Sequence, residues 1–140
     1  MKIQRATEAT DELVEALARL IPQLTRSRQP PSWAELQELV QTQTLLVARG
    51  ADGKVTGTLT LVLYRIPTGL RAHIDDVVVD EACRGQGIGE ALTEEAVRLA
   101  REGGALTVEL TSHPSREGAN RLYRRLGFEQ RETNVYRLRL

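Results

Sequence analysis

The sequence has little cysteine, little lysine and no excess of either charge. Its single cysteine, Cys83, excludes an internal disulfide and any metal site built from several cysteines. The two histidines, His73 and His113, stand far apart with no ligand spacing around them, so we expect no metal. Nineteen basic residues, only two of them lysine, balance nineteen acidic ones, which argues against nucleic acid as a partner.

Long hydrophobic runs are also missing. No stretch approaches the roughly 18 consecutive apolar residues of a membrane span, so we expect no membrane partner. The opening residues Met1–Arg5 lack the layout of a signal peptide, and we expect a cytoplasmic protein. The 140 residues contain no internal repeat and no obvious linker, which predicts a single domain over residues 1–140.

The hydrophobic pattern changes from helical to strand-like near Thr44. Apolar residues recur three and four apart after Thr10, and Ser32 with Glu35 forms the capping box of a second helix. Three strand-like segments follow and predict an antiparallel meander. The expected elements after it are a long helix from residue 88, a strand over 105–110, a last helix closed by Gly127, and two short extended pieces. This order predicts the α+β class.

A glycine-rich turn is the most informative segment. Gly85, Gly87 and Gly89 stand between a run of valines and a helix, where free N–H groups and the helix dipole suit a phosphate. Arg84 adds a positive charge. A turn that uses glycine only for its backbone geometry is the alternative. Two other phosphate loops do not fit. A P-loop needs Lys after its last glycine, and Gly89 is followed by Glu90. A dinucleotide fingerprint needs a third glycine three residues after Gly87, and that position is also Glu90.

The same segment resembles a known family. Arg84-Gly85-Gln86-Gly87-Ile88-Gly89 is similar to the Arg/Gln-x-x-Gly-x-Gly/Ala motif of the GNAT N-acetyltransferase superfamily. Residues 120–128, Asn-Arg-Leu-Tyr-Arg-Arg-Leu-Gly-Phe, resemble the second signature of that family. The two motifs stand in the family's order and cover most of residues 70–128.

The resemblance implies a GNAT fold with a mixed, mostly antiparallel sheet of about six to seven strands, flanked by about four helices. It implies acetyl-coenzyme A (acetyl-CoA) as co-substrate, held in a cleft where two strands splay apart. The implied cofactor-binding residues are the main chain of Val77, Val78 and Val79, the turn of Arg84, Gly85, Gln86, Gly87, Ile88 and Gly89, and the side chains of Asn120 and Tyr123.

Acyl transfer to an amine needs a base for the amine, a donor for the oxyanion and a proton for the departing thiolate. Tyr123 is the candidate proton donor, because it lies on the same side of a helix as Asn120 and because the resemblance implies that role. Packing of an aromatic ring under the sheet is the alternative use of this side chain.

The base is expected among the carboxylates of the strands. Asp75 and Asp76 stand in an otherwise apolar strand, where an ionised group is costly unless it is used or paired. Neighbouring strand residues face opposite sides, so only one of the two is expected to face the cleft unless a bulge intervenes. We favour Asp76 or Asp75, with Glu109 as a third candidate.

The acceptor is expected to be the primary amine of a small molecule. The strand 73–79 resembles that of glucosamine-6-phosphate N-acetyltransferases, and the last helix resembles that of aminoalkylphosphonate acetyltransferases, which both suggest a phosphate- or phosphonate-bearing amine. Ser112 and Arg116 are candidates for binding an anionic group. A protein or peptide amine is an alternative acceptor, and an acetyl-CoA sensor without turnover is an alternative function.

The end of the chain predicts an assembly. Residues 134–140 alternate apolar and basic side chains, which is typical of a strand near the edge of a sheet. Exposed edge strands pair readily with other chains. We therefore expect a homodimer.

Overall fold

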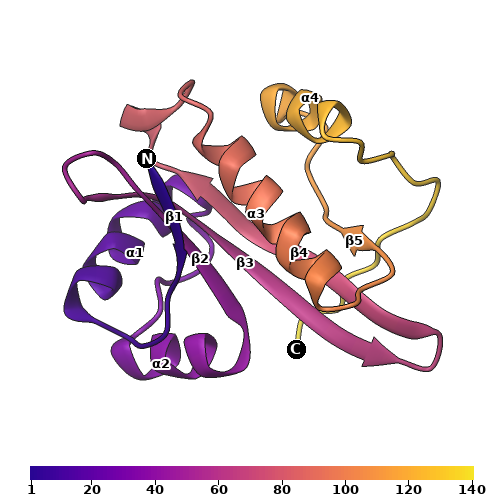
Figure 1. Cartoon of the computed structure of the whole chain (residues 1–140), viewed down its shortest axis with the longest axis horizontal. Helices are drawn as coiled ribbons and strands as arrows, with labels where there is room; N and C mark the ends of the chain where they lie inside the picture. Colours follow the sequence, from indigo (N-terminus) through magenta and orange to yellow (C-terminus); the bar gives the residue numbers. More distant parts are fainter.

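The computed structural model describes all residues from Met1 to Leu140 as one sheet with helices on both faces (Figure 1). The strands are β1 (Lys2–Arg5), β2 (Thr44–Arg49), β3 (Val55–Ile66), β4 (Gly69–Val79) and β5 (Val108–Glu109). The α-helices are α1 (Asp11–Leu24), α2 (Trp33–Thr42), α3 (Ile88–Glu102) and α4 (Glu117–Arg125), with a short 3₁₀ turn, η1 (Glu81–Cys83), before α3.

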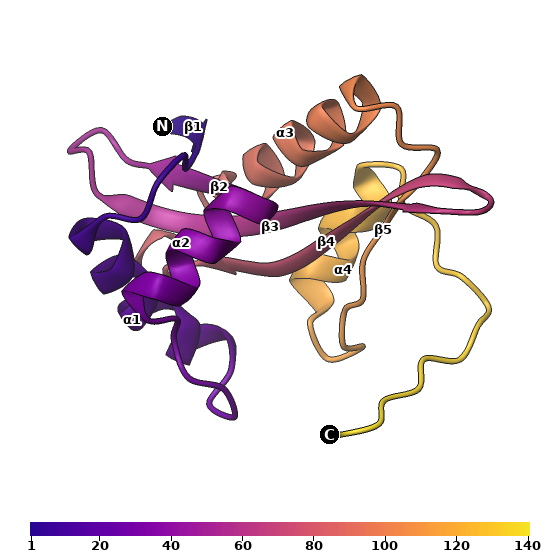
Figure 2. The ribbon, with the colours of Figure 1, turned by 90° about the horizontal axis from the view of Figure 1, so that it is seen from below.

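The sheet follows chain order, β1-β2-β3-β4-β5. The first four strands pair antiparallel, and β4 pairs with β5 in parallel. The long hairpin of β3 and β4 forms the centre of the sheet and extends beyond its neighbours at the turn (Figure 2).

The two faces of the sheet carry separate apolar clusters. Leu45 and Val47 of β2 pack with α1 and α2, whereas Leu46 and Ala48 pack with α3, as the alternation of a strand requires. The first cluster is centred on Leu13, Leu17, Leu20, Leu36 and Val40, and the second on Leu59, Leu61, Ile74, Leu92 and Ala96. Figure 2 shows α3 on one side of the sheet and α1 with α2 on the other.

Gly57 of β3 allows α3 to lie close to the sheet. A Cβ atom there would stand 2.9 Å from the carbonyl oxygen of Val78 and 3.3 Å from side-chain carbons of Ile88 and Leu92. Contacts of that length with fixed backbone would force the helix and the strand apart. The absence of a side chain at position 57 therefore lets the first turns of α3 pack closely against the sheet.

The sequence overestimates the number of strands. Five are present instead of about six to seven, and the segment expected as a strand over 105–110 is a strand only at Val108–Glu109. Residues 134–140 form no strand, although their side chains alternate, because they lie extended in solvent without a neighbouring strand to pair with. No helix has the length and apolar character needed to cross a membrane.

Candidate active site

The strands β4 and β5 separate soon after they meet. Their pairing consists of Ala72 with Val108 and His73 with Glu109. Beyond His73, β4 continues to Val79 with β3 as its only neighbouring strand. Residues 74–79, which include Val77, Val78 and Val79, thus have a main-chain edge that no strand covers.

A bulge distorts β4 at the start of this open edge. The partners of Thr58 and Thr60 are Val78 and Asp75, so β4 uses three steps where β3 uses two. Asp76 takes up the extra residue with φ +49°, the only positive φ of a residue other than glycine. Such a conformation carries a small strain that aspartate tolerates better than most residues.

The bulge brings both carboxylates to one pocket of about 510 Å³. Asp75 and Asp76 border it together with Tyr123 of α4, and the end of α1, the loop after it and the segment after β5 complete the wall. Asp76 also borders a second cavity of about 260 Å³ between α1 and α2. The alternation that would separate adjacent strand residues is therefore broken where the candidate base lies.

The two carboxylates have different surroundings. Asp75 forms a hydrogen bond with His73, in which Oδ2 of Asp75 and Nδ1 of His73 are 3.0 Å apart. The side chain of Asp75 is 54% exposed. Asp76 is an exposed residue as well, but partial desolvation of its carboxylate at the pocket raises its pKa above the ordinary value, and the neighbouring charge of Asp75 raises it further. Asp76 has no hydrogen-bond partner in the chain. A carboxylate in this state binds a proton more readily than an ordinary aspartate.

Glu109, the third candidate, lies elsewhere. Its Oε1 stands 3.1 Å from Nη1 of Arg131, and it does not border the pocket. The position of Glu109 beside His73 on the paired part of β5 keeps it on the closed side of the strand separation.

Tyr123 is buried, with 7% of its surface exposed, and it borders the same pocket. Its ring meets that of Phe128 edge to face at 5.8 Å, and the N–H of Phe128 donates to the carbonyl of Tyr123. Burial raises the pKa of the Tyr123 hydroxyl, against a smaller opposing effect of the charge of Arg116. The phenol therefore stays protonated near neutral pH.

Asn120 lies one turn before Tyr123 and supports the loop in front of α4. Its Nδ2 donates to the carbonyl oxygen of His113 at 3.1 Å. The hydroxyl of Ser112 is buried without a partner and does not border the pocket, contrary to its expected contact with an anionic group. Arg116 does border the pocket, as expected.

The turn from Arg84 to Gly89 leads into α3. Gly85 and Gly87 both have φ +79°, and a Cβ atom at either would point into open space. Gly87 is the N-cap of α3 and provides no side-chain cap, and the first helical hydrogen bond runs from Ala91 to Gly87. The N–H groups before Ala91 therefore have no partner within the helix.

The other members of this turn contribute in different ways. Arg84 is exposed, and its Nε donates to the carbonyl oxygen of Val79 at 3.3 Å. Ile88 is buried in the core, so only its main chain is available to a ligand. Gln86 is exposed, and a Cβ atom added at Gly89 would stand 3.7 Å from side-chain carbons of Val79 and Leu122, which is ordinary contact distance. The turn follows the open edge of β4 along the chain, and residues 74–77 of that edge border the pocket.

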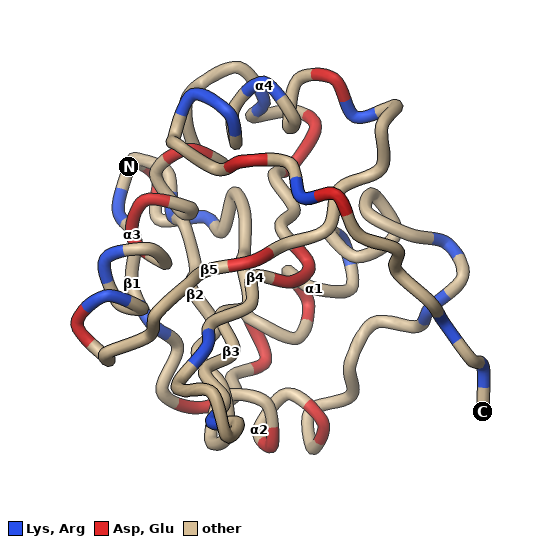
Figure 3. The backbone as a smooth tube through the Cα atoms, turned by 90° about the vertical axis from the view of Figure 1, so that its right-hand side faces the viewer, with Lys and Arg blue, Asp and Glu red and all other residues tan.

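Four arginines border the pocket: Arg28 from the loop after α1, Arg116, and Arg137 and Arg139 from the end of the chain. None of them forms an ion pair within the protein. Figure 3 shows the basic residues along the C-terminal segment. Sequence reasoning missed three of the four, and the excess of arginine over lysine in the composition is the one signal that could have drawn attention to them.

No three His, Cys, Asp or Glu side chains gather in a way that could hold a metal ion.

The chain is similar to known acetyltransferases. The profile of the "Acetyltransferase (GNAT) family" matches residues 11–128. A probable glucosamine 6-phosphate N-acetyltransferase of Oryza sativa subsp. japonica is 33% identical over 121 residues, which cover 79% of this chain and 73% of that protein. An uncharacterized N-acetyltransferase of Methanocaldococcus jannaschii is 43% identical over 61 residues, which cover 44% of this chain but only 27% of that longer protein.

The fold is similar as well. The crystal structure of a Trypanosoma brucei acetyltransferase matches with a TM-score of 0.77 and 26% identity, and covers 99% of this chain and 100% of its own. The residues matched by the family, 11–128, include both segments, 84–89 and 120–128, that carry the resemblance in the sequence.

Proposed function

Because the chain belongs to the acetyltransferase (GNAT) family, we propose that it transfers the acetyl group of acetyl-CoA to the primary amine of a small molecule by direct attack. The observation that carries the proposal is the meeting of Asp76 and Tyr123 at one pocket beside the open edge of β4. A base for the amine and an acid for the leaving group stand there together.

The residues around the open edge fit acetyl-CoA. The uncovered main chain of Val77–Val79 can pair with an extended amide-bearing chain as a neighbouring strand would. The free N–H groups at the start of α3 and the charge of Arg84 suit a pyrophosphate, and the open space at Gly85 and Gly87 admits it closely. Asn120 of α4 is the proposed side-chain hydrogen-bond partner of the cofactor. Acetyl-CoA supplies the reactive acetyl thioester.

Asp76 is the proposed base, and Asp75 acts as its neighbour. The raised pKa of Asp76 suits removal of a proton from an ammonium group at neutral pH better than an ordinary carboxylate would. Asp75 already shares a hydrogen with His73. The amine nitrogen, freed of its proton, forms the new N–C bond as the C–S bond breaks.

Tyr123 is the proposed acid. Its hydroxyl stays protonated, borders the pocket and makes no hydrogen bond with another group of the chain. It can therefore give its proton to the departing sulfur. The nitrogen loses a second proton as the amide forms, which balances the proton that Tyr123 gives to sulfur, and Asp76 then releases its own proton to solvent.

We propose further that the acceptor carries a phosphate or another dianionic group. The pocket presents four arginines without carboxylate partners, and a dianion beside the reacting amine would meet their guanidinium groups. The rice relative is a glucosamine 6-phosphate N-acetyltransferase by its printed name. An amino sugar phosphate is therefore the first acceptor to test.

The test compares glucosamine 6-phosphate with glucosamine in a free-thiol assay with acetyl-CoA. We expect kcat/KM to be at least about tenfold higher for the phosphate ester, because it alone meets the arginines. Equal values would reject the dianionic acceptor while leaving the acetyltransferase. Thiol release only with peptide amines would favour the protein-acetylating alternative, and cofactor binding without turnover on any amine would favour a sensor.

A homodimer is proposed on separate grounds. Val135, Tyr136 and Leu138 in the C-terminal segment are 75%, 87% and 83% exposed, and the outer edge of β5 has no neighbouring strand. Apolar side chains on an extended segment are suited to pairing with a second copy. Sedimentation velocity at micromolar concentration should give a dimer that is lost on truncation after Thr133. A single 15.6 kDa species of the full chain would contradict it.

A further inference from the structure

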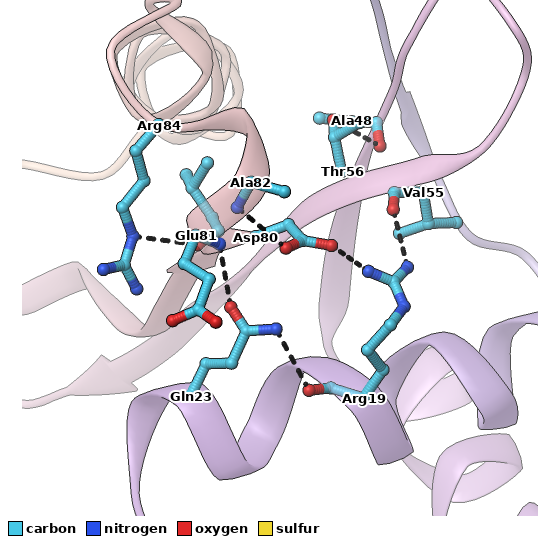
Figure 4. Close-up of polar contacts among 10 residues, drawn as sticks. Arg19, Gln23, Ala48, Val55, Thr56, Asp80, Glu81, Ala82 and Arg84 are labelled. Atoms are coloured by element: carbon cyan, nitrogen blue, oxygen red, sulfur yellow. Dashed lines mark hydrogen bonds and ion pairs between the residues drawn. The ribbon is translucent and has the colours of Figure 1, made fainter.

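The connection between β4 and the glycine turn is held from α1, far away in the sequence. Arg19 of α1 reaches across with both terminal nitrogens of its guanidinium group (Figure 4). Its Nη1 donates to Oδ2 of Asp80, and its Nη2 donates to the carbonyl oxygen of Val55 at 2.9 Å. One side chain thus ties α1 to the start of β3 and to the end of β4.

Gln23 makes a second tie one helical turn later. Its Oε1 accepts from the main-chain N–H of Glu81 at 2.8 Å, and its Nε2 donates to the carbonyl oxygen of Arg19 at 3.3 Å. Residues four apart lie on the same face of a helix, so Arg19 and Gln23 approach the connection together. Figure 4 shows both side chains rising from α1 toward the 3₁₀ turn.

Asp80 passes this support on to the turn itself. While Oδ2 accepts from Arg19, Oδ1 accepts from the N–H of Ala82 at 3.1 Å. The N–H of Cys83 donates to the carbonyl of Asp80, which closes the 3₁₀ turn. Arg84 then donates to Val79 across the same bend. Every residue from 80 to 84 therefore makes at least one hydrogen bond within this connection, to β3 or to α1.

The next residues have no comparable support. Gly85 and Gly87 have positive φ, no atom lies near their Cα positions on the side-chain side, and no side chain caps α3. Glycine has the largest conformational freedom of any residue, so its ordering on binding a phosphate has a cost in entropy. A fixed residue 84 on one side and the buried Ile88 on the other reduce that freedom.

We propose that Arg19 and Gln23 are positioning residues for acetyl-CoA, which hold Asp80–Arg84 so that the glycine turn is ordered for the pyrophosphate. The inference rests on the cofactor site of the proposed function and not on the identity of the acceptor. It gives α1 a role at the cofactor, in addition to the wall of the acceptor pocket that its last residue, Leu24, provides.

The test uses Arg19→Met and Gln23→Leu, which remove the hydrogen bonds and keep the apolar stem of each side chain. The dissociation constant of acetyl-CoA, measured by titration calorimetry without an acceptor, should rise about tenfold in each variant. The KM for acetyl-CoA should rise similarly, with kcat unchanged. With S-acetylpantetheine, which lacks the pyrophosphate, each variant should match the unmodified protein.

Arg49→Met is the matched control. Arg49 forms a bidentate pair with Glu12 at the other end of α1, at 2.7 and 3.0 Å, and so ties the same helix to the sheet away from the glycine turn. This control should lower the melting temperature without changing the affinity for acetyl-CoA.

Three results would overturn the proposal: unchanged affinity in both variants, an equal loss with S-acetylpantetheine, or the same loss of affinity in Arg49→Met. Should Arg19→Met fail to fold, Gln23→Leu and Arg19→Lys carry the test, and the lysine should weaken affinity less because it keeps one donor. Because calorimetry needs no acceptor, a wrong choice of amine would leave these results unaffected.

Discussion

The first two helices of the chain begin in a different way from the last two. In α1, Thr10 accepts from the N–H of Leu13 at 3.1 Å, and in α2, Ser32 and Glu35 complete a capping box. In α3 and α4, the N-cap residues Gly87 and Arg116 provide no side-chain cap. The first N–H groups of a helix need partners from outside it.

This difference separates stability from binding. The helices α1 and α2 satisfy their own N-terminal ends, so the capping residues Thr10 and Ser32 serve the fold. The helices α3 and α4 start beside the open edge of β4 and the pocket, where a ligand can be the missing partner. Changes at the capped ends should therefore alter stability alone, and changes at the uncapped ends should alter ligand binding and turnover.

The largest effect is expected from Tyr123→Phe. It removes the proposed proton donor, which is worth about a hundredfold or more in kcat, and keeps the ring contact with Phe128. The hydroxyl bonds no group of the chain, so the melting temperature should barely change. Steady-state kinetics and thermal unfolding of the same preparation check both parts. A kcat within threefold of the unmodified protein, roughly 0.6 kcal/mol in barrier height, would remove Tyr123 from the mechanism.

The next effect is expected from Gly87→Ala, which places a side chain at φ +79° at the uncapped end of α3. The strain should cost about 1–2 kcal/mol in the free energy of unfolding, and the affinity for acetyl-CoA should fall. Gly53→Ala is the matched control, because Gly53 has φ +83° and open space around it, in the turn between β2 and β3. It should lose similar stability in denaturant titrations and keep its affinity for acetyl-CoA; an equal fall in affinity would show that strain alone is responsible.

A smaller effect is expected at the capped side. Ser32→Ala removes the hydroxyl oxygen that accepts from the N–H of Glu35 at 3.2 Å, and it should cost about 1 kcal/mol of stability. The kinetic constants should stay unchanged, because α2 begins away from the uncapped helix ends. Urea unfolding and the thiol assay measure the two quantities. A fall in kcat at full saturation would contradict the assignment of the capped helix ends to stability alone.

The smallest effect is the pH-dependent stability of Asp76→Asn. The raised pKa of Asp76 means that its ionised form disfavours the folded state, so the neutral amide should stabilise the protein slightly at pH 7. The advantage should shrink as the pH falls through the raised pKa, and it should vanish below the ordinary value of 3.8, where both states carry a neutral acid. Asparagine also accepts the positive φ. Melting curves from pH 7 to 3 test this, and a constant difference over that range would point to the backbone instead.

Family membership was predictable from short segments. The glycines of residues 84–89 and the helix that carries Asn120 and Tyr123 are local patterns, whose geometry depends on neighbours in the chain. The GNAT resemblance and the α+β class are confirmed by the match over residues 11–128 and by the similarity of fold. The roles of Asp76 and Tyr123 stay predictions.

Contacts between distant segments were not predictable. Arg19 and Asp80 are 61 positions apart, and nothing near either residue marks the other as its partner. The bulge at Asp76 depends on the register of β3 with β4, which two apolar strands do not specify to one residue. The alternating pattern of residues 134–140 indicated a strand, but a strand also needs a neighbour with a free edge in reach.

Gly57 also affects the position of the glycine turn. The turn starts α3, and the height of α3 above β3 is limited by the hydrogen atom at position 57. The distance between α3 and the sheet, and with it the position of the turn, therefore depends on a residue almost thirty positions earlier in the chain. A Gly57→Ala substitution would push α3 away from the sheet and shift the turn with it, although the sequence of the turn itself is unchanged.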